Sequence, residues 1–142
     1  MLNVECGMEK GSPEKYKDFV FDFEKLDVYQ LALKFIHKLI TLVKNLPTEL
    51  RLSLGNNLVR AGMSIVNNIA EGSGKKSPKE KRRYYGTSLD SARECIPTIT
   101  VVHGEGHITD EYRDELRGDC LEICNKMAKL IQSVEMTFNI TH

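Results

Sequence analysis

The sequence predicts an all-α protein, an antiparallel up-down-up-down four-helix bundle. In four long segments apolar residues recur at spacings of three and four, which is the pattern of a helix with one buried face. The connections between these segments are short, which places consecutive helices antiparallel to one another. No alternation of apolar and polar residues, the pattern of a half-buried strand, competes with the helical spacing.

Composition sets the class of protein. The 142 residues suffice for one domain with a core, and 41% hydrophobic and 28% charged residues are typical of a soluble globular chain. No apolar run approaches the ~18 residues of a membrane span, and the start of the chain lacks a secretory signal. We therefore expect a cytoplasmic protein, with no membrane partner, in which Cys6, Cys95, Cys120 and Cys124 are reduced.

The chain begins with a segment that shows no sustained period and contains Gly7, Gly11 and Pro13. We expect a flexible extension at residues 1–22, followed by the bundle domain at residues 23–138.

The first two helices follow from their apolar stripes. The first is predicted from about Lys25 to Leu46, and its apolar face is wider than one neighbouring helix can cover. The second begins near Thr48 and carries small residues that admit a neighbouring backbone. Gly72 and Gly74 are interpreted as the stop at its C-terminus.

The third helix has the clearest start, because Ser77-Pro78-Lys79-Glu80 has the pattern of a capping box. Its stripe continues to about Val102, and Pro97 inside it is expected to kink the helix. The fourth helix is predicted to begin at Thr109, where two acidic residues suit the positive end of the helix dipole.

Positive charge is concentrated between the second and third helices. Residues 75–83 contain six basic side chains and one acidic one, on a chain whose formal net charge is zero. Such a run can neutralise phosphates in a sequence-independent, salt-sensitive way, and a solvated helix start has the same pattern. Tyr84 or Tyr85 could add a stacking surface, although Tyr85 fits the apolar stripe. The candidate nucleic-acid-binding residues are Lys75, Lys76, Lys79, Lys81, Arg82 and Arg83, with Arg51 and Arg60 as weaker candidates.

An acidic segment lies further along the chain. Between Glu105 and Glu122 seven acidic residues stand against two arginines. The basic residues 75–83 of one copy can pair with the acidic residues 105–122 of another. The apolar face of the first helix is too wide for one neighbouring helix, so a second copy could bury the rest of it. Together they favour a cyclic homo-oligomer.

Two cysteines and two histidines near the fourth helix could together bind a metal ion. Cys120 and Cys124 are four residues apart on the fourth helix, and His103 and His107 precede that helix. The simpler reading is that Cys120 is a small buried side chain of the apolar stripe and that the histidines are solvated in a turn. A di-iron site is excluded because the sequence has no Glu-x-x-His pair.

Enzyme sites find little support in the sequence. Residues 71–77 lack the first glycine and the preceding strand of a phosphate-binding loop. Cys95 lies in mid-helix with only Arg93 placed to activate it. We therefore expect a protein that is not an enzyme, with no catalytic residues and no cofactor, and a thiol- or metal-dependent enzyme is the weakest alternative.

Two segments resemble a known family. Residues 23–32, Phe-Glu-Lys-Leu-Asp-Val-Tyr-Gln-Leu-Ala, and residues 60–72, Arg-Ala-Gly-Met-Ser-Ile-Val-Asn-Asn-Ile-Ala-Glu-Gly, are similar to the signatures of four-helix-bundle proteins encoded in 23S rRNA intervening sequences. The likeness continues through residues 79–88 and 92–94 and spans about 21–135. This family includes relatives of the Avd accessory proteins of diversity-generating retroelements.

The resemblance implies a bacterial bundle that assembles as a homopentameric ring and binds RNA or DNA through a basic surface. In the retroelement branch it also implies a reverse transcriptase as partner. The extension 1–22, Val66 in place of a usual proline, and Pro97 depart from the family pattern. The expected function is a non-enzymatic nucleic-acid-binding accessory protein. The alternative is a purely structural or protein-interaction bundle whose basic end docks an acidic partner.

Overall fold

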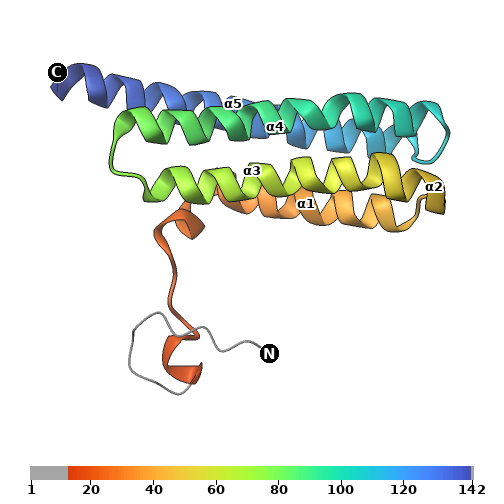
Figure 1. The fold of residues 1–142 in the computed structure, drawn as a ribbon, viewed down its shortest axis with the longest axis horizontal. Coiled ribbons are helices and arrows are strands. Elements are labelled where there is room, and N and C mark those ends of the chain that lie inside the picture. The colour runs from red at the N-terminus through yellow and green to blue at the C-terminus, as the bar shows by residue number, and fades with distance from the viewer. Residues whose placement is uncertain (1–12, 142) are drawn as a thin grey trace.

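Four long helices form the bundle that the sequence predicts (Figure 1). The computed structural model describes residues 13–141, and of residues 138–141 only the backbone; every regular element in this part of the chain is helical. Contacts join α1 to α3, α3 to α4, α4 to α5 and α5 to α1, which closes the bundle. The long helices are α1 (Asp27–Lys44), α3 (Asn56–Gly74), α4 (Pro78–Gly104) and α5 (Asp110–Thr141).

Each long helix buries its predicted apolar stripe. Burying one large aliphatic or aromatic side chain contributes about 1.5–3 kcal/mol, so these stripes are the main source of stability. The wide face of α1 is only partly covered, since Tyr29, Leu33 and Ile40 remain half-buried. The largest fully buried side chains include Phe35, Leu39, Leu58, Ile65, Ile69, Ile99, Leu116, Ile123 and Met127.

The predicted second helix is a continuous helical run with one irregular turn. It consists of α2 (Thr48–Leu50), the π-helical turn η3 (Arg51–Gly55) and α3. A Cβ on Gly62 would lie 2.5 Å from Cδ1 of Ile36, which is closer than packed carbon atoms can approach. Glycine at this position therefore allows α1 and α3 to pack closely.

The start and end of α4 follow from local chemistry. The Ser77 hydroxyl accepts a hydrogen bond from the backbone N–H of Glu80 over 3.4 Å, which confirms Ser77 as the N-cap. The helix continues through Pro97 to Gly104, although proline leaves the carbonyl one turn earlier without its helical donor. Gly106 adopts a φ of 81°, a left-handed conformation that suits glycine, and turns the chain into α5.

The segment before α1 lies on the side of α1 and α3. Its last turn, residues 22–25, contacts both helices, and the residues before that turn extend away from the bundle (Figure 1). It contains two 3-10 turns, η1 (Pro13–Tyr16) and η2 (Asp22–Lys25). The first twelve residues of the predicted flexible extension, which include Cys6, lie outside the described part of the chain. In the part that the structure describes, no helix is both long and apolar enough to cross a bilayer.

Candidate nucleic-acid interface

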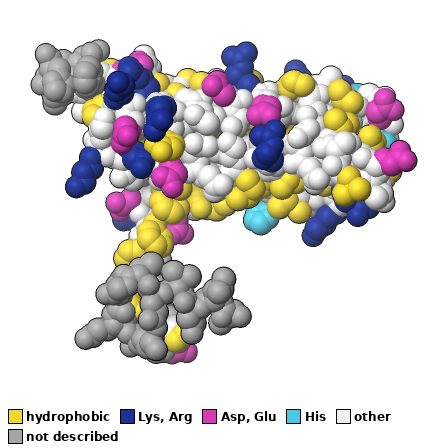
Figure 2. Space-filling view, in the orientation of Figure 1, with side chains coloured by type: hydrophobic (Ala, Val, Ile, Leu, Met, Phe, Trp, Pro, Cys, Tyr) yellow, Lys and Arg dark blue, Asp and Glu magenta, His cyan; other side chains and the backbone are white. Residues whose placement is uncertain are grey.

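All six candidate basic residues lie at one end of the bundle. Because α3 ends at Gly74 and α4 begins at Pro78, the run occupies the turn between them and the first turns of α4. In Figure 2 Lys and Arg side chains gather at this end of the molecule. We call the surface formed by Lys75, Lys76, Lys79, Lys81, Arg82 and Arg83 the basic end.

The turn that carries the basic end is fixed by close packing at Gly72. Gly72 is buried, and a Cβ there would lie 2.7 Å from Cε1 of Tyr85. Tyr85 is itself only 3% exposed, so it belongs to the core and offers no stacking surface. Among the described residues only Gly106 has a positive φ. The predicted helix stop is therefore correct in position, but Gly72 serves packing against Tyr85 and not a left-handed cap.

Lys81 is the member of the basic end that is used inside the protomer. Its ammonium donates hydrogen bonds to the backbone carbonyls of Ser73, over 2.9 Å, and Gly72, over 3.3 Å. These carbonyls belong to the last turn of α3, where helical partners are missing and the helix dipole is negative. Lys81 thus supplies a hydrogen-bond donor to the last carbonyl groups of α3. It is therefore less available to an outside ligand than the neighbouring basic residues are.

Tyr84 is enclosed by cations. The Lys75 ammonium lies 5.2 Å and the Arg83 guanidinium 5.0 Å from the centroid of its ring. Lys75 also forms an ion pair with Glu71 over 3.8 Å, one helical turn earlier. The two cations hold positions on the Tyr84 ring that a stacked base would need, so Tyr84 serves first to position Lys75 and Arg83.

The remaining members of the basic end point outward. Arg82 lies 3.7 Å from Glu135 at the far end of α5, and both side chains are about half exposed. Lys76 and Lys79 are exposed and form no ion pair with any residue that the structure describes. These two ammonium groups, together with Arg83, are the most available for an anion.

The electrostatic balance at this end stays positive. The six basic side chains have three acidic residues, Glu71, Glu80 and Glu135, as ion-pair partners or neighbours in the run, and the N-terminus of α4 adds its partial positive charge. Free backbone N–H groups in the first turn of a helix also bind phosphate oxygens. The arrangement therefore suits a polyanion that contacts the turn before α4.

The two weaker candidates lie elsewhere. Arg60 forms an ion pair with Glu94 over 2.9 Å between α3 and α4. Arg51 donates to the carbonyl of Leu46 over 3.3 Å, in the turn at the opposite end of the bundle. The structure does not bring either arginine to the basic end.

The acidic segment lies at the end of the bundle opposite the basic end, around the turn into α5 (Figure 2). Four of its seven acids are already paired within the protomer. The Asp110 carboxylate accepts a hydrogen bond from the His103 ring over 2.7 Å, and Asp114 pairs with Arg113 over 2.9 Å. Lys38 on α1 lies 2.6 Å from Asp119 and 3.4 Å from Glu115.

The alternative metal ligands are not brought together. Cys120 is buried and its thiol donates to the carbonyl of Ala92 over 2.9 Å, as expected for a side chain of the apolar stripe. His103 pairs with Asp110, the first residue of α5. Cys120 lies further along that helix, about 15 Å from Asp110 at the helical rise of 1.5 Å per residue. Within residues 13–141 no cluster of three or more Cys, His, Asp or Glu is placed to hold a metal ion.

Cys95 has the environment of a structural thiol. Burial, with smaller effects from Glu94 and Cys124, raises its pKa to about 12, so the thiol stays protonated near neutral pH. Its Sγ donates to the carbonyl of Ser91 in its own helix. A thiol that does not ionise is a poor nucleophile.

Sequence reasoning missed two surfaces. Residues 18–23, which we call the aromatic arm, form a ladder in which the ring centroids of Phe19, Phe21 and Phe23 are 5.0 Å and 5.7 Å apart. The signal was present as aromatic residues at every second position of Phe-Val-Phe-Asp-Phe. The second surface is a groove between α4 and α5 that contains Arg93 and Arg117; no sequence pattern marked it.

Comparisons with known proteins agree with the fold. A family model described as 23S rRNA-intervening sequence protein matches residues 24–129. A crystal structure of a protein of unknown function from the S23 ribosomal protein family of Bacteroides thetaiotaomicron is 24% identical, with a TM-score of 0.69. The match covers 74% of this chain and 95% of that chain. No curated protein matches the chain.

Proposed function

Because this chain belongs to the 23S rRNA-intervening sequence protein family, we propose that it is a non-enzymatic accessory protein that binds RNA or DNA through its basic end. The observation that carries the proposal is the exposure of Lys76 and Lys79 beside the N-terminus of α4, without an ion pair in the described part of the chain. Flexible cations next to a helix N-terminus suit phosphate groups and carry no base specificity. The proposed ligand is therefore the sugar-phosphate backbone.

The proposal has two further parts that concern protein partners. One is a homo-oligomer, most simply the pentameric ring that the family resemblance implies, in which several basic ends act on one nucleic acid and raise its avidity. The other is a reverse transcriptase as partner, which rests on the resemblance to Avd proteins alone.

The test compares two variants that remove the same charge. The Lys76→Gln, Lys79→Gln double variant alters the basic end, and the Lys34→Gln, Lys44→Gln double variant alters exposed lysines of α1. Binding of a labelled 30-nucleotide single-stranded RNA, and of duplex DNA of the same length, is measured over a series of salt concentrations. Each lost phosphate contact reduces the slope of log K against log salt by about 1, so we expect a reduction of about 2 in the first variant only.

Two outcomes would contradict the proposal. Equal affinity and equal salt slope in both variants would remove the basic end as the binding surface. The absence of any binding by the wild-type protein at micromolar concentration would favour the alternative, a protein-interaction bundle whose basic end docks an acidic protein.

A further inference from the structure

An apolar groove lies between α4 and α5. Its volume is about 430 Å³, within the range of about 300–1,000 Å³ of sites that enclose ligand-sized groups. Ile96 and Cys124 lie along it half-buried, and Leu121 is 62% exposed. An open apolar groove of this size is a candidate surface for binding another molecule.

The groove carries positive charge and no negative charge among its lining residues. Arg93 reaches it from α4 and Arg117 from α5. Neither arginine forms an ion pair with a residue in the described part of the chain. An occupant that is both apolar and acidic would complement the groove.

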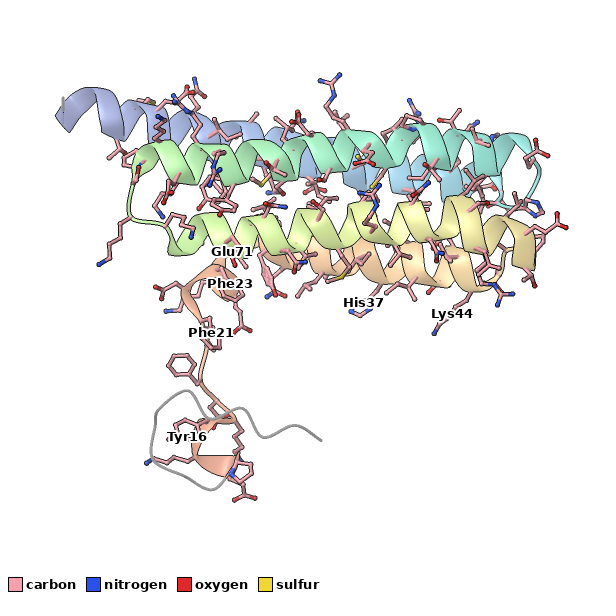
Figure 3. The ribbon with its side chains drawn as sticks, in the orientation of Figure 1. Tyr16, Phe21, Phe23, His37, Lys44 and Glu71 are labelled. Atoms are coloured by element: carbon pink, nitrogen blue, oxygen red, sulfur yellow. The ribbon has the colours of Figure 1, made fainter. Side chains whose placement is uncertain are left out.

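The aromatic arm has this chemistry. Phe19 is 63% and Phe21 56% exposed, and the arm also contains Asp18 and Asp22 and no basic residue. Figure 3 shows Phe21 and Phe23 along the segment that leaves the bundle below α1 and α3. The arm lies outside residues 24–129, which match the family model.

We propose that the aromatic arm of one copy docks into the α4–α5 groove of a second copy. The rings of Phe19 and Phe21 would lie on Leu121 and its apolar neighbours, and the two aspartates would pair with Arg93 and Arg117. Phe23 stays on its own protomer, where its ring packs against Tyr29 with the centroids 5.0 Å apart. The arm leaves from the layer of α1 and α3, whereas the groove belongs to the layer of α4 and α5 (Figure 1). A contact between two different surfaces repeats from copy to copy and closes into a ring or extends as a filament. The proposal concerns contact between copies and does not depend on nucleic-acid binding.

A disulfide tests the contact directly. Cys124 supplies a native thiol in the groove, and Phe21→Cys places one on the arm of the full chain. Cys6→Ser in the same chain removes the thiol outside the described residues. Disulfides form only when the Cβ atoms approach to about 4 Å. Mild oxidation without nucleic acid should therefore give, on a non-reducing denaturing gel, a ladder of linked species that begins at twice the 16.1 kDa chain.

Cys124→Ser in the same background is the control and should reduce the linked species at least tenfold, since it removes the partner thiol. Peptide mapping must find residue 21 joined to residue 124. A disulfide within one chain, a link between two arms, or no linked species would overturn the proposal.

Charge reversal gives an independent measure. Arg117→Glu should weaken self-association at least tenfold in sedimentation equilibrium, and adding Asp22→Arg to the same chain should restore it. Lys129→Glu makes the same charge change on an exposed residue of α5 outside the groove and should leave self-association unchanged. If Arg117→Glu leaves self-association unchanged, or if Asp22→Arg fails to restore it, the arm does not bind the groove.

Discussion

The ammonium of Lys81 donates a hydrogen bond to the backbone carbonyl of Ser73 over 2.9 Å, which ties the start of α4 to the end of α3. Lys79, two residues earlier, is exposed and has no ion pair with the residues that the structure describes. The same short run of charge thus contains a cation that stabilises a helix end and a cation available to a ligand. This difference leads to opposite predictions for two lysines that look alike in sequence.

Replacing Lys81 with Met should lower the free energy of unfolding by about 1 kcal/mol, because the carbonyls at the end of α3 lose a charged donor. Lys79→Met should change it by less than about 0.5 kcal/mol, as is usual for an exposed side chain. Urea denaturation measures both. We expect RNA affinity to fall more in Lys79→Met than in Lys81→Met; equal losses of stability would refute the distinction.

Gly72 and Gly74 provide a second matched pair. A Cβ on Gly72 would lie 2.7 Å from Cε1 of Tyr85, whereas a Cβ on Gly74 would meet nothing within 4 Å. Gly72→Ala should therefore destabilise the protein by about 1–3 kcal/mol through overpacking. Gly74→Ala should be neutral or stabilise it by up to about 1 kcal/mol, because alanine restricts the unfolded chain. Thermal unfolding of the two variants gives the comparison, and similar melting temperatures would argue against a packing role for Gly72.

The helices were predictable because their signal is local. A stripe at spacings of three and four identifies a helix wherever it occurs, and the Ser77 cap is encoded within four residues. The role of Gly72 was not predictable in the same way, since it depends on Tyr85 thirteen residues later in a different helix. The π-helical turn at Arg51–Gly55 likewise has no distinctive sequence pattern.

The location of the candidate site was predictable from the sequence. Which of its basic residues are engaged within the protomer was not. Charge counting found the basic run at a helix junction, and the structure places all of it at one end of the bundle. Which cations are engaged depends on partners distant in sequence, such as Glu135 for Arg82. The aromatic arm was missed because its alternating pattern lies outside any helix, in a segment that lacks a helical period.

The ion pair between α1 and α5 gives a prediction about alkaline pH. Lys38 lies 2.6 Å from Asp119, and this hydrogen bond, opposed in part by burial, raises the pKa of Lys38 above its ordinary value of 10.5. Because the folded pKa is the higher one, the stabilisation is complete below pH 10.5 and is lost as the pH rises through the folded value. Lys38→Met should cost about 1 kcal/mol near pH 7, and its difference from wild type should shrink above pH 10.5.

Lys34→Met, one turn earlier on an exposed position of α1, is the control for this pair and should leave the free energy of unfolding nearly unchanged. Urea denaturation at pH 7, 9 and 11 measures all three proteins. A Lys38→Met effect that is the same at pH 11 as at pH 7 would show that the side chain acts through packing and not through its charge.

Cys95 gives a prediction that concerns the whole fold. Burial raises its pKa from 9.0 to about 12, so between these values the unfolded thiol ionises while the folded one stays protonated. The stabilisation linked to this group is therefore complete below pH 9 and is lost as the pH rises toward 12, by about 1.4 kcal/mol per pH unit. Cys95→Ala should lose about 1–2 kcal/mol at pH 7 through its cavity, and its stability should then fall less steeply than that of wild type above pH 9. Val102→Ala, a truncation of another fully buried residue of α4, should lower stability equally at every pH. Urea denaturation in a reducing buffer from pH 7 to 11 compares the slopes, and parallel curves for wild type and Cys95→Ala would contradict a buried, protonated thiol.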